Sequence, residues 1–162
     1  MTVRHTRSED LPVLLEIFEG ARAFMAEQGN PNQWGPFGWP HADVIEEDIR
    51  IGKSYVIEEE GEIVGTFYLD VGDCPEPGYL TIQGDGWRYD APYAVIHRIA
   101  SRFTAKGILA TAVSFALTKA EHVRIDTHED NVPMRTGLAK LGFSYRGIVT
   151  LERGIVRLAF ER

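Results

Sequence analysis

The sequence predicts one domain over residues 1–162 with an α+β fold, in which helices flank a mixed, mostly antiparallel central sheet. The first observation is the order of the predicted elements: strand, helix, helix, three strands, helix, strand, helix and two strands. The second is size and composition, since 162 residues, 44% of them hydrophobic, are enough to bury a core. The third is that no internal repeat or low-complexity tract interrupts the chain. These observations together indicate a single globular domain.

The first third of the chain predicts a strand and two helices separated by a loop. Residues 2–6 alternate well enough for a strand. Apolar residues then recur at the spacing of a helix, at Leu11, Leu14, Leu15, Phe18, Ala21 and Met25. Pro12 fits this helix only in or near its first turn. Residues 29–40 hold three prolines and three glycines, which exclude a helix or a long strand, and a second helix follows His41.

The rest of the chain predicts two hairpins and two strand–helix units. The hairpins join residues 54–58 to 63–69 and residues 144–151 to 155–161. The strands at 93–101 and 123–127 each precede a helix, the first starting at Gly107 and the second at Asn131. Residues 71–92 are rich in Gly, Pro and Asp, and we expect them to form an insertion or lid.

Charge is divided unevenly along the chain. Residues 1–93 carry 6 Lys or Arg and 18 Asp or Glu, whereas residues 94–162 carry 11 and 6. A basic half suits a polyphosphate and an acidic half favours a cationic amine, although both halves could equally be ordinary solvated surface. The net charge of −7 and the lack of a dense basic cluster argue against a nucleic-acid partner.

The cysteine content and hydropathy bear on the compartment. Cys74 is the only cysteine, so the chain cannot form an internal disulfide, which fits a reducing environment. No apolar run approaches the length of a membrane span, and the N-terminus lacks a basic-then-apolar signal pattern. We therefore expect a cytoplasmic protein with no membrane partner.

The strand at 93–101, the short loop after it and the helix starting at Gly107 predict an anion site. The first turn of a helix leaves backbone N–H groups without partners, and the helix dipole adds partial positive charge there. A strand, a turn and a helix that starts at a glycine therefore place free N–H groups where a phosphate can bind. One glycine at a helix start is a weak signal, and the motifs around it strengthen the prediction.

Five motifs in the last third carry a resemblance to a known family. They are HRIAS, KGI, DTHEDN, KLGF and LERGIVRLAFE. In this order they resemble the GCN5-related N-acetyltransferase (GNAT) family, strongly over residues 93–162 and diffusely over residues 1–70. The resemblance implies a three-layer fold, acetyl-CoA as co-substrate and transfer of an acetyl group to an amine. The family often forms dimers, and exposed aromatic residues would permit a homodimer here.

The resemblance also implies which residues contact coenzyme A. The family's pyrophosphate loop has a glutamine or arginine, two residues, a glycine, one residue, and a glycine or alanine. Here Thr104 takes the first position, Gly107 is kept, and Leu109 takes the last. The strand end would pair with the pantetheine arm through its backbone. The expected coenzyme contacts are Ile99, Ala100, Ser101, Thr104, Ala105, Lys106, Gly107, Ile108, Leu109, Ala110, Asn131 and Met134.

The catalytic groups of this chain differ from those usual in the family. The family often carries a tyrosine as general acid where this chain has Leu138. His97 is our candidate general base, because histidine exchanges protons near neutral pH, and a half-buried structural histidine is the competing interpretation. His97 shares a face of its strand with Ile99 unless a bulge intervenes. None of His41, His122 and His128 has metal-ligand spacing with a carboxylate or with Cys74, so we expect no metal.

Trp34 and Trp87 are our candidates for the acceptor pocket, because the resemblance implies that both lie in loops that lead toward the thioester. Asp85 and Asp90 flank Trp87 and would attract a cationic amine. The leading prediction is therefore an N-acetyltransferase for a small amine or amino-acid-like acceptor, with direct transfer in a ternary complex. The alternatives are a non-catalytic domain that binds or senses coenzyme A, and a relative that uses a longer acyl-CoA or none.

Overall fold

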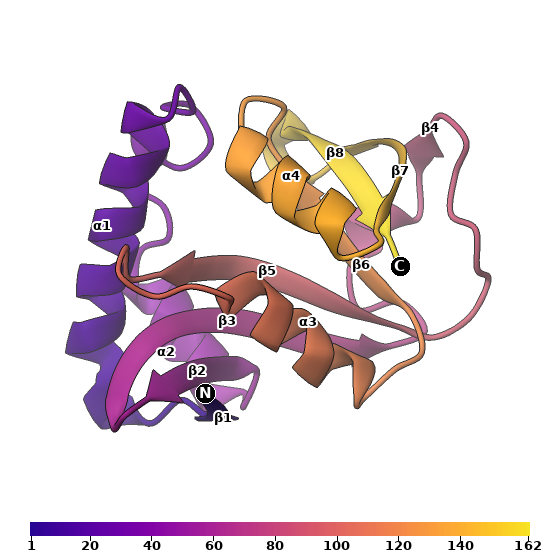
Figure 1. Ribbon diagram of the computed structural model, residues 1–162. Helices are drawn as coiled ribbons and strands as arrows, with labels where there is room; N and C mark the ends of the chain where they lie inside the picture. Colours follow the sequence, from indigo (N-terminus) through magenta and orange to yellow (C-terminus); the bar gives the residue numbers. More distant parts are fainter.

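A computed structural model describes all residues, 1–162, and contains one eight-stranded sheet (Figure 1). The strand order is β1-β2-β3-β5-β6-β8-β7-β4. Every neighbouring pair is antiparallel except β5 and β6, which are parallel. The strands are β1 (Thr2–His5), β2 (Ser54–Glu59), β3 (Glu62–Gly72), β4 (Ile82–Gln83), β5 (Tyr93–Ser101), β6 (Val123–Thr127), β7 (Ser144–Thr150) and β8 (Val156–Glu161). The predicted α+β class and mixed, mostly antiparallel sheet are confirmed.

Four α-helices form the outer layers of the fold. They are α1 (Leu11–Glu27), α2 (Ala42–Arg50), α3 (Ile108–Leu117) and α4 (Val132–Lys140). α1 and α2 pack on one face of the sheet, and α3 and α4 cover the other, as Figure 1 shows. Pro12 lies in the first turn of α1, where its missing N–H leaves no hydrogen bond unmade. None of the helices combines the length and apolarity needed to span a bilayer.

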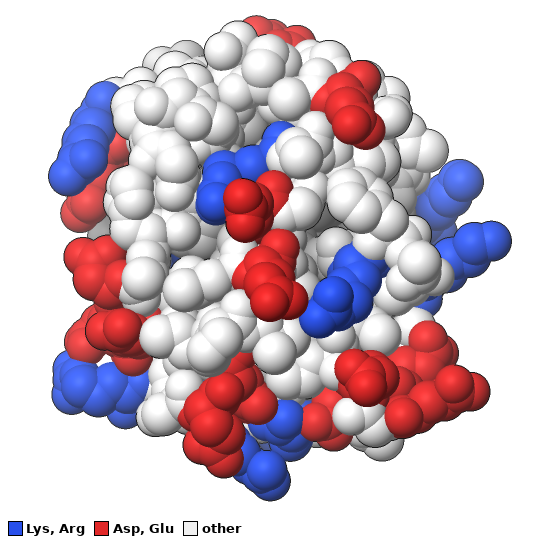
Figure 2. Space-filling model, turned by 90° about the vertical axis from the view of Figure 1, so that its left-hand side faces the viewer, with Lys and Arg blue, Asp and Glu red and all other residues white.

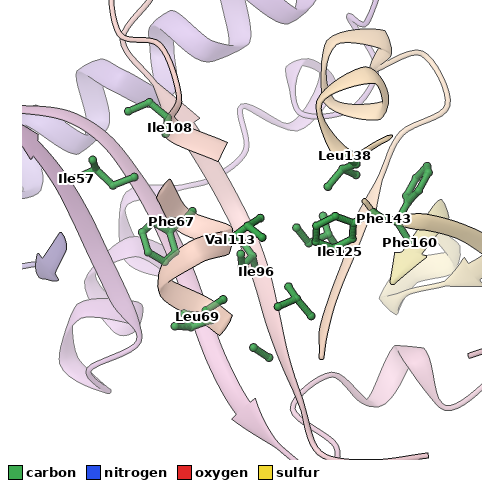
Figure 3. Packing of buried hydrophobic residues seen from close by; sticks show 14 of the residues in the cluster. Ile57, Phe67, Leu69, Ile96, Ile108, Val113, Ile125, Leu138, Phe143 and Phe160 are labelled. Carbon is green, nitrogen blue, oxygen red and sulfur yellow. The ribbon is translucent and has the colours of Figure 1, made fainter. Parts of the chain in front are cut away.

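The largest hydrophobic cluster lies beneath α3 and α4. Its side chains form two groups in Figure 3, one from β3, β5 and α3 around Phe67, and one from β6, β8 and α4 around Ile125. A second cluster lies under α1 and α2 and includes Phe18 and Val56. A third surrounds Tyr79 on the same face as α1 and α2, toward the opposite end of the sheet. The sheet is therefore buried on both faces.

The segment expected to be an irregular insertion or lid is a packed part of the domain. β3 continues to Gly72, and β4 pairs with β7 at the edge of the sheet, a strand that the sequence pattern did not predict. A Cβ at Gly147 would lie 2.0 Å from the carbonyl oxygen of Gln83, so only glycine permits this approach. Tyr79, from the same segment, is 1% exposed and anchors it to the sheet.

Candidate active site

The parallel strands β5 and β6 separate shortly after they begin. Their pairing is confined to Ala94 with Val123 and Val95 with Arg124, although β5 continues to Ser101. Figure 1 shows the two strands moving apart from this point. Each keeps its antiparallel partner on the other side, so the backbone edge of β5 that faces β6 has no ladder partner beyond Val95. An unpaired strand edge can hydrogen-bond an extended ligand, which is how we expect the pantetheine arm to bind.

A β-bulge in β5 lies at this separation. Thr66 pairs with Ala100 but Tyr68 pairs with His97, so β5 contains one residue more than β3 between these pairs. The backbone of Arg98 absorbs the extra residue with a φ of 48°, a conformation that L-residues seldom adopt.

Two contacts of the Arg98 side chain stabilise the bulge. Its guanidinium donates two hydrogen bonds of 2.8 Å to the Asp48 carboxylate on α2. It also lies 4.5 Å from the ring centroid of Tyr68, within the range of a cation–π contact. α2 thereby fixes the strand at the position where the chain has its unusual backbone.

The bulge corrects one expectation from the sequence. His97 lies beside Tyr68 and Tyr79, whereas Ile99 packs against the cluster beneath α3 on the other face. The two side chains therefore do not share a face, because the bulge shifts the alternation of the strand by one residue.

His97 lies between two carboxylates. Its Nε2 is 3.0 Å from Oε2 of Glu76, and its Nδ1 is 3.7 Å from Oδ2 of Asp126. The phenol of Tyr79 donates a 2.5 Å hydrogen bond to the same oxygen of Asp126. Burial, followed by the Asp126 charge, raises the pKa of Tyr79 well above its ordinary value, so this group remains a donor. The imidazole is thus held in a fixed orientation.

This arrangement can accept a proton at His97. With Nε2–H donated to Glu76, Nδ1 is the ring nitrogen left to take up a proton, and the charge that forms would lie beside Asp126. Carboxylates that orient a histidine and offset its positive charge are typical of general-base sites. The same contacts would also serve a purely structural histidine, and the kinetics of variants separate the two roles.

The charge of Glu76 predicts part of the pH dependence of stability. The hydrogen bond from His97 lowers the pKa of Glu76 below its ordinary value of 4.5, and the amide of Gly78 adds to this effect. A depressed pKa in the folded state contributes stability that is present above pH 4.5 and is lost as pH falls through the folded value. The free energy of unfolding should therefore fall less steeply between pH 5 and about pH 3 in Glu76→Gln than in the wild type. Urea unfolding at several pH values measures both slopes, and equal slopes would contradict the assignment.

The start of α3 has the features expected of a phosphate site. Gly107 precedes the helix with a φ of 79°, and no side chain caps the first turn. A Cβ at Gly107 would meet nothing within 4 Å, so the space in front of the helix is open. Thr104 and Lys106 are exposed at this opening, and the N–H groups of residues 108–110 are without helical partners. These residues suit a pyrophosphate despite the loss of the family's glutamine or arginine.

Leu109, which stands where the family's loop pattern has a glycine or alanine, packs against a glycine on α4. A Cβ at Gly137 would lie 2.9 Å from Cδ2 of Leu109. Gly137 therefore provides the room that Leu109 occupies between α3 and α4. Ala105 and Ala110 are partly buried near the same helix start, and Ile108 is 5% exposed.

Asn131 fills the helix-cap position expected of it. Its Oδ1 accepts from the N–H of Met134 at 3.2 Å, and its Nδ2 donates to Oε1 of Gln33 at 3.0 Å. Gln33 lies in the 29–40 loop, so this contact ties the loop to the start of α4. Met134 is partly buried against the main cluster. Contacts of Asn131 and Met134 with the coenzyme stay predictions.

The two tryptophans expected at the acceptor pocket lie apart. Trp34 is 7% exposed and packs edge-on against Phe18 in the cluster under α1. Trp87 donates from Nε1 to the carbonyl of Tyr79 at 2.7 Å and stacks on the guanidinium of Arg124 at 4.2 Å. Both therefore have packing partners of their own, and neither is placed next to His97 by a contact. Their contact with an acceptor stays a prediction.

Leu138, at the position of the family's tyrosine, is fully buried in the main cluster. It contributes packing and cannot act as an acid. The structure brings Glu76, Tyr79 and Asp126 to His97 instead, and the sequence analysis missed all three. Asp126 offered a signal, because a carboxylate inside a strand of a buried sheet needs a polar partner. Glu76 offered none, since it lies in an irregular segment.

Acidic and basic side chains are mixed on the face of the molecule to which α1 belongs. Figure 2 shows acidic and basic side chains side by side there, and no broad field of one sign. Several acidic residues of the N-terminal half have basic partners nearby: Asp10 and Glu58 pair with Arg4, Asp70 with Lys53, and Asp48 with Arg98. The acidic excess of residues 1–93 is therefore partly neutralised locally, and attraction of an amine depends on groups at the site itself.

Among known proteins, solved structures of acetyltransferases are similar to this chain. No protein-family model matches the chain, and no curated protein matches its sequence. A GNAT-family acetyltransferase from Streptococcus agalactiae has a solved structure with 31% sequence identity and a TM-score of 0.87, over 99% of this chain and 94% of that one. A putative acetyltransferase from Staphylococcus aureus has 22% identity and a TM-score of 0.70, over 100% and 98% of the two chains.

A more distant structure contains ligands. The aminoglycoside enzyme AAC(6')-Ib, in complex with ribostamycin and coenzyme A, has 19% identity and a TM-score of 0.66, over 99% of this chain and 92% of that chain. At this identity the likeness concerns the fold alone. The Streptococcus structure, by contrast, is similar to this chain in sequence as well as in fold, over nearly the full length of both.

Proposed function

The chain belongs to the GNAT family and is an N-acetyltransferase, and from this premise we propose that it transfers the acetyl group of acetyl-CoA directly to a small primary amine. The observation that carries the proposal is the separation of β5 and β6 beside His97, which leaves a strand edge for the donor and an oriented base for the acceptor. AAC(6')-Ib, whose structure contains coenzyme A and ribostamycin, supports coenzyme A binding and a small-molecule acceptor.

The residues divide between the two substrates. The free N–H groups at the start of α3, with Lys106, would hold the pyrophosphate. The unpaired edge of β5, through Ile99 to Ser101, would hold the pantetheine arm. Acetyl-CoA supplies an activated carbonyl, and this chain supplies orientation and a proton acceptor.

An ammonium acceptor first gives one proton to solvent, and transfer in this site then needs one further proton removed from the neutral amine as it attacks. The amine nitrogen forms a bond to the thioester carbonyl carbon, the carbon–sulfur bond breaks, and coenzyme A leaves as a thiolate. His97 takes the proton that the amine loses, directly or through a water molecule. The thiolate is a tolerable leaving group and takes a proton from solvent, so the loss of the family's tyrosine does not prevent turnover. Direct transfer is preferred to a covalent acetyl-enzyme because Cys74 is the only thiol and it makes no hydrogen bond to a base that would activate it.

A panel of primary amines tests the proposal. Thiol release from acetyl-CoA should depend on the acceptor, and mass spectrometry should detect the acetylated amine. The rates should give intersecting initial-rate lines when both substrates are varied, as a ternary complex requires. Parallel lines would contradict direct transfer. Thiol release that no amine stimulates would contradict the acceptor class.

A further inference from the structure

Two carboxylates on different elements flank the imidazole of His97. Glu76 of the segment 71–92 lies 3.0 Å from Nε2, and Asp126 of β6 lies 3.7 Å from Nδ1. Negative charge beside an imidazole favours its protonated, cationic form. The proposed transfer needs a neutral His97 when the amine arrives, so the charges of the two carboxylates must be offset within the fold.

The charge of Glu76 is offset by neighbours along the chain. Its Oε1 accepts from the amide of Gly78 at 2.9 Å. The hydrogen bond from His97 is the main cause that lowers the pKa of Glu76, and the Gly78 amide and the charge of Arg98 add to it. Glu76 therefore stays ionised with partners other than His97.

Tyr79 offsets part of the charge of Asp126. Its phenol donates a 2.5 Å hydrogen bond to Oδ2 of Asp126, the same oxygen that faces Nδ1 of His97. A short hydrogen bond to a carboxylate oxygen stabilises the negative charge there. The 3.7 Å between this oxygen and Nδ1 is longer than a hydrogen bond, so Asp126 acts on His97 through its charge.

Arg157 of β8 lies on the same face of the sheet as Asp126. Asp126 pairs with Ala159, two residues beyond Arg157, and Arg157 itself pairs with Val149 of β7. Ala159 and Val149 both belong to the cluster around Tyr79. Arg157 therefore occupies the diagonal position next to Asp126 on neighbouring strands, within reach of a long side chain.

The guanidinium of Arg157 is a positive charge whose hydrogen-bond acceptors are neutral. It donates to the backbone carbonyls of Val156 at 3.0 Å and Gln33 at 3.4 Å. Burial lowers the pKa of Arg157, and the charge of Asp126 opposes this effect. Because a guanidinium keeps its proton in proteins, Arg157 supplies a constant positive charge that acts on Asp126.

The remaining titratable groups around His97 offset one another or are neutral. Arg98, next to it in β5, pairs with Asp48 of α2, whose carboxylate also interacts with the charge of His97. Tyr68 of β3 packs beside His97, and burial raises its pKa, so this phenol stays neutral. The effect of Asp126 on His97 therefore depends on Tyr79 and Arg157.

We infer that Tyr79 and Arg157 are positioning residues that act through Asp126 to keep His97 unprotonated, and so able to accept the proton of the amine. Each reduces the attraction of Asp126 for a proton on the imidazole, Tyr79 by a hydrogen bond and Arg157 by its charge. The inference deepens the proposed function and rests on it for the role of His97 as the base.

NMR titration of the His97 imidazole, assigned with His97→Gln, tests the inference without turnover. Arg157→Gln should raise the pH of half-protonation by about 0.5–1 pH unit, because the charge of Asp126 is then less offset. Arg157→Lys keeps the positive charge and should stay close to the wild type. Tyr79→Phe should shift the titration upward, as Arg157→Gln does, whereas Asp126→Asn should shift it downward.

A charge-matched variant and a double variant provide the controls. Arg153→Gln removes the same charge from the exposed turn of the same hairpin and should leave the titration of His97 unchanged. If Arg157 acts through Asp126, Arg157→Gln should shift the titration much less in the Asp126→Asn background. No shift in Arg157→Gln and Tyr79→Phe, or an undiminished shift without the Asp126 charge, would overturn the inference.

The pH dependence of kcat/KM separates this inference from the proposed function. Its acid limb should move with the NMR titration in Arg157→Gln, because kcat/KM reports the protonation of the free enzyme. NMR shifts without a matching movement of the acid limb would support the roles of Tyr79 and Arg157 and count against His97 as the base. An acid limb that moves while the His97 titration stays fixed would overturn the inference and leave acetyl transfer standing.

Discussion

Replacing His97 by Gln should lower kcat by about 10²- to 10⁴-fold while leaving acetyl-CoA binding close to that of the wild type. Glutamine can still hydrogen-bond Glu76, so the change removes the proton acceptor and keeps much of the polar contact. If His97 is the base, the acid limb of the pH–rate profile should also disappear in the variant. Steady-state kinetics of thiol release across pH measures both effects.

A second histidine provides the control for this result. His41 is exposed, its side chain makes no capping hydrogen bond, and it lies outside the strands that form the site. His41→Gln should therefore leave kcat and the pH profile unchanged. A His97→Gln enzyme with wild-type kcat would show that His97 is structural and that the base lies elsewhere.

Replacing Arg98 by Ala should destabilise the fold by about 3–5 kcal/mol. Asp48 would be left buried with no partner, because both of its side-chain hydrogen bonds come from Arg98 and its side chain is 8% exposed. Burial already raises the pKa of Asp48 with Arg98 beside it, which shows how costly its charge is in this position. The bulge that orients His97 should also relax, so kcat per folded molecule should fall.

Urea unfolding distinguishes this buried pair from a surface pair on the same helix. Arg50 pairs with Glu47 near the end of α2, with side chains 71% and 53% exposed, and Arg50→Ala should leave the free energy of unfolding nearly unchanged. Adding Asp48→Asn to Arg98→Ala removes the unpaired charge and should recover part of the loss. Equal effects of Arg98→Ala and Arg50→Ala would show that the buried pair does not determine stability.

Much of the fold could be predicted from the sequence because periodicity and turn residues agree along the chain. Each predicted helix and strand is present, and Gly107 and Asn131 lie where their helices begin. β4 was missed because a strand of two residues, Ile82–Gln83, has no periodicity of its own. Its pairing depends on Gly147, which is distant in sequence and permits the close approach only because it lacks a Cβ.

The site was less predictable, because long-range contacts define it. His97 could be chosen from its strand. Whether its side chain shares a face with Ile99, however, depends on a bulge at Arg98, whose partner Asp48 is on α2. Trp34 stood out as an aromatic residue in a loop, yet burial places it in a core cluster.

The central claim is that the start of α3 binds the acetyl donor. Titration calorimetry with acetyl-CoA tests this claim most directly. The wild type should bind one equivalent, and Gly107→Asp should weaken binding strongly, because it places a carboxylate where we expect the pyrophosphate. Gly154→Asp is the matched control, since both glycines have positive φ (79° and 74°) and open space at the Cβ position. Binding that only Gly107→Asp weakens would support the donor site at the start of α3. No binding to the wild type at millimolar acetyl-CoA, or equal loss in both variants, would contradict it.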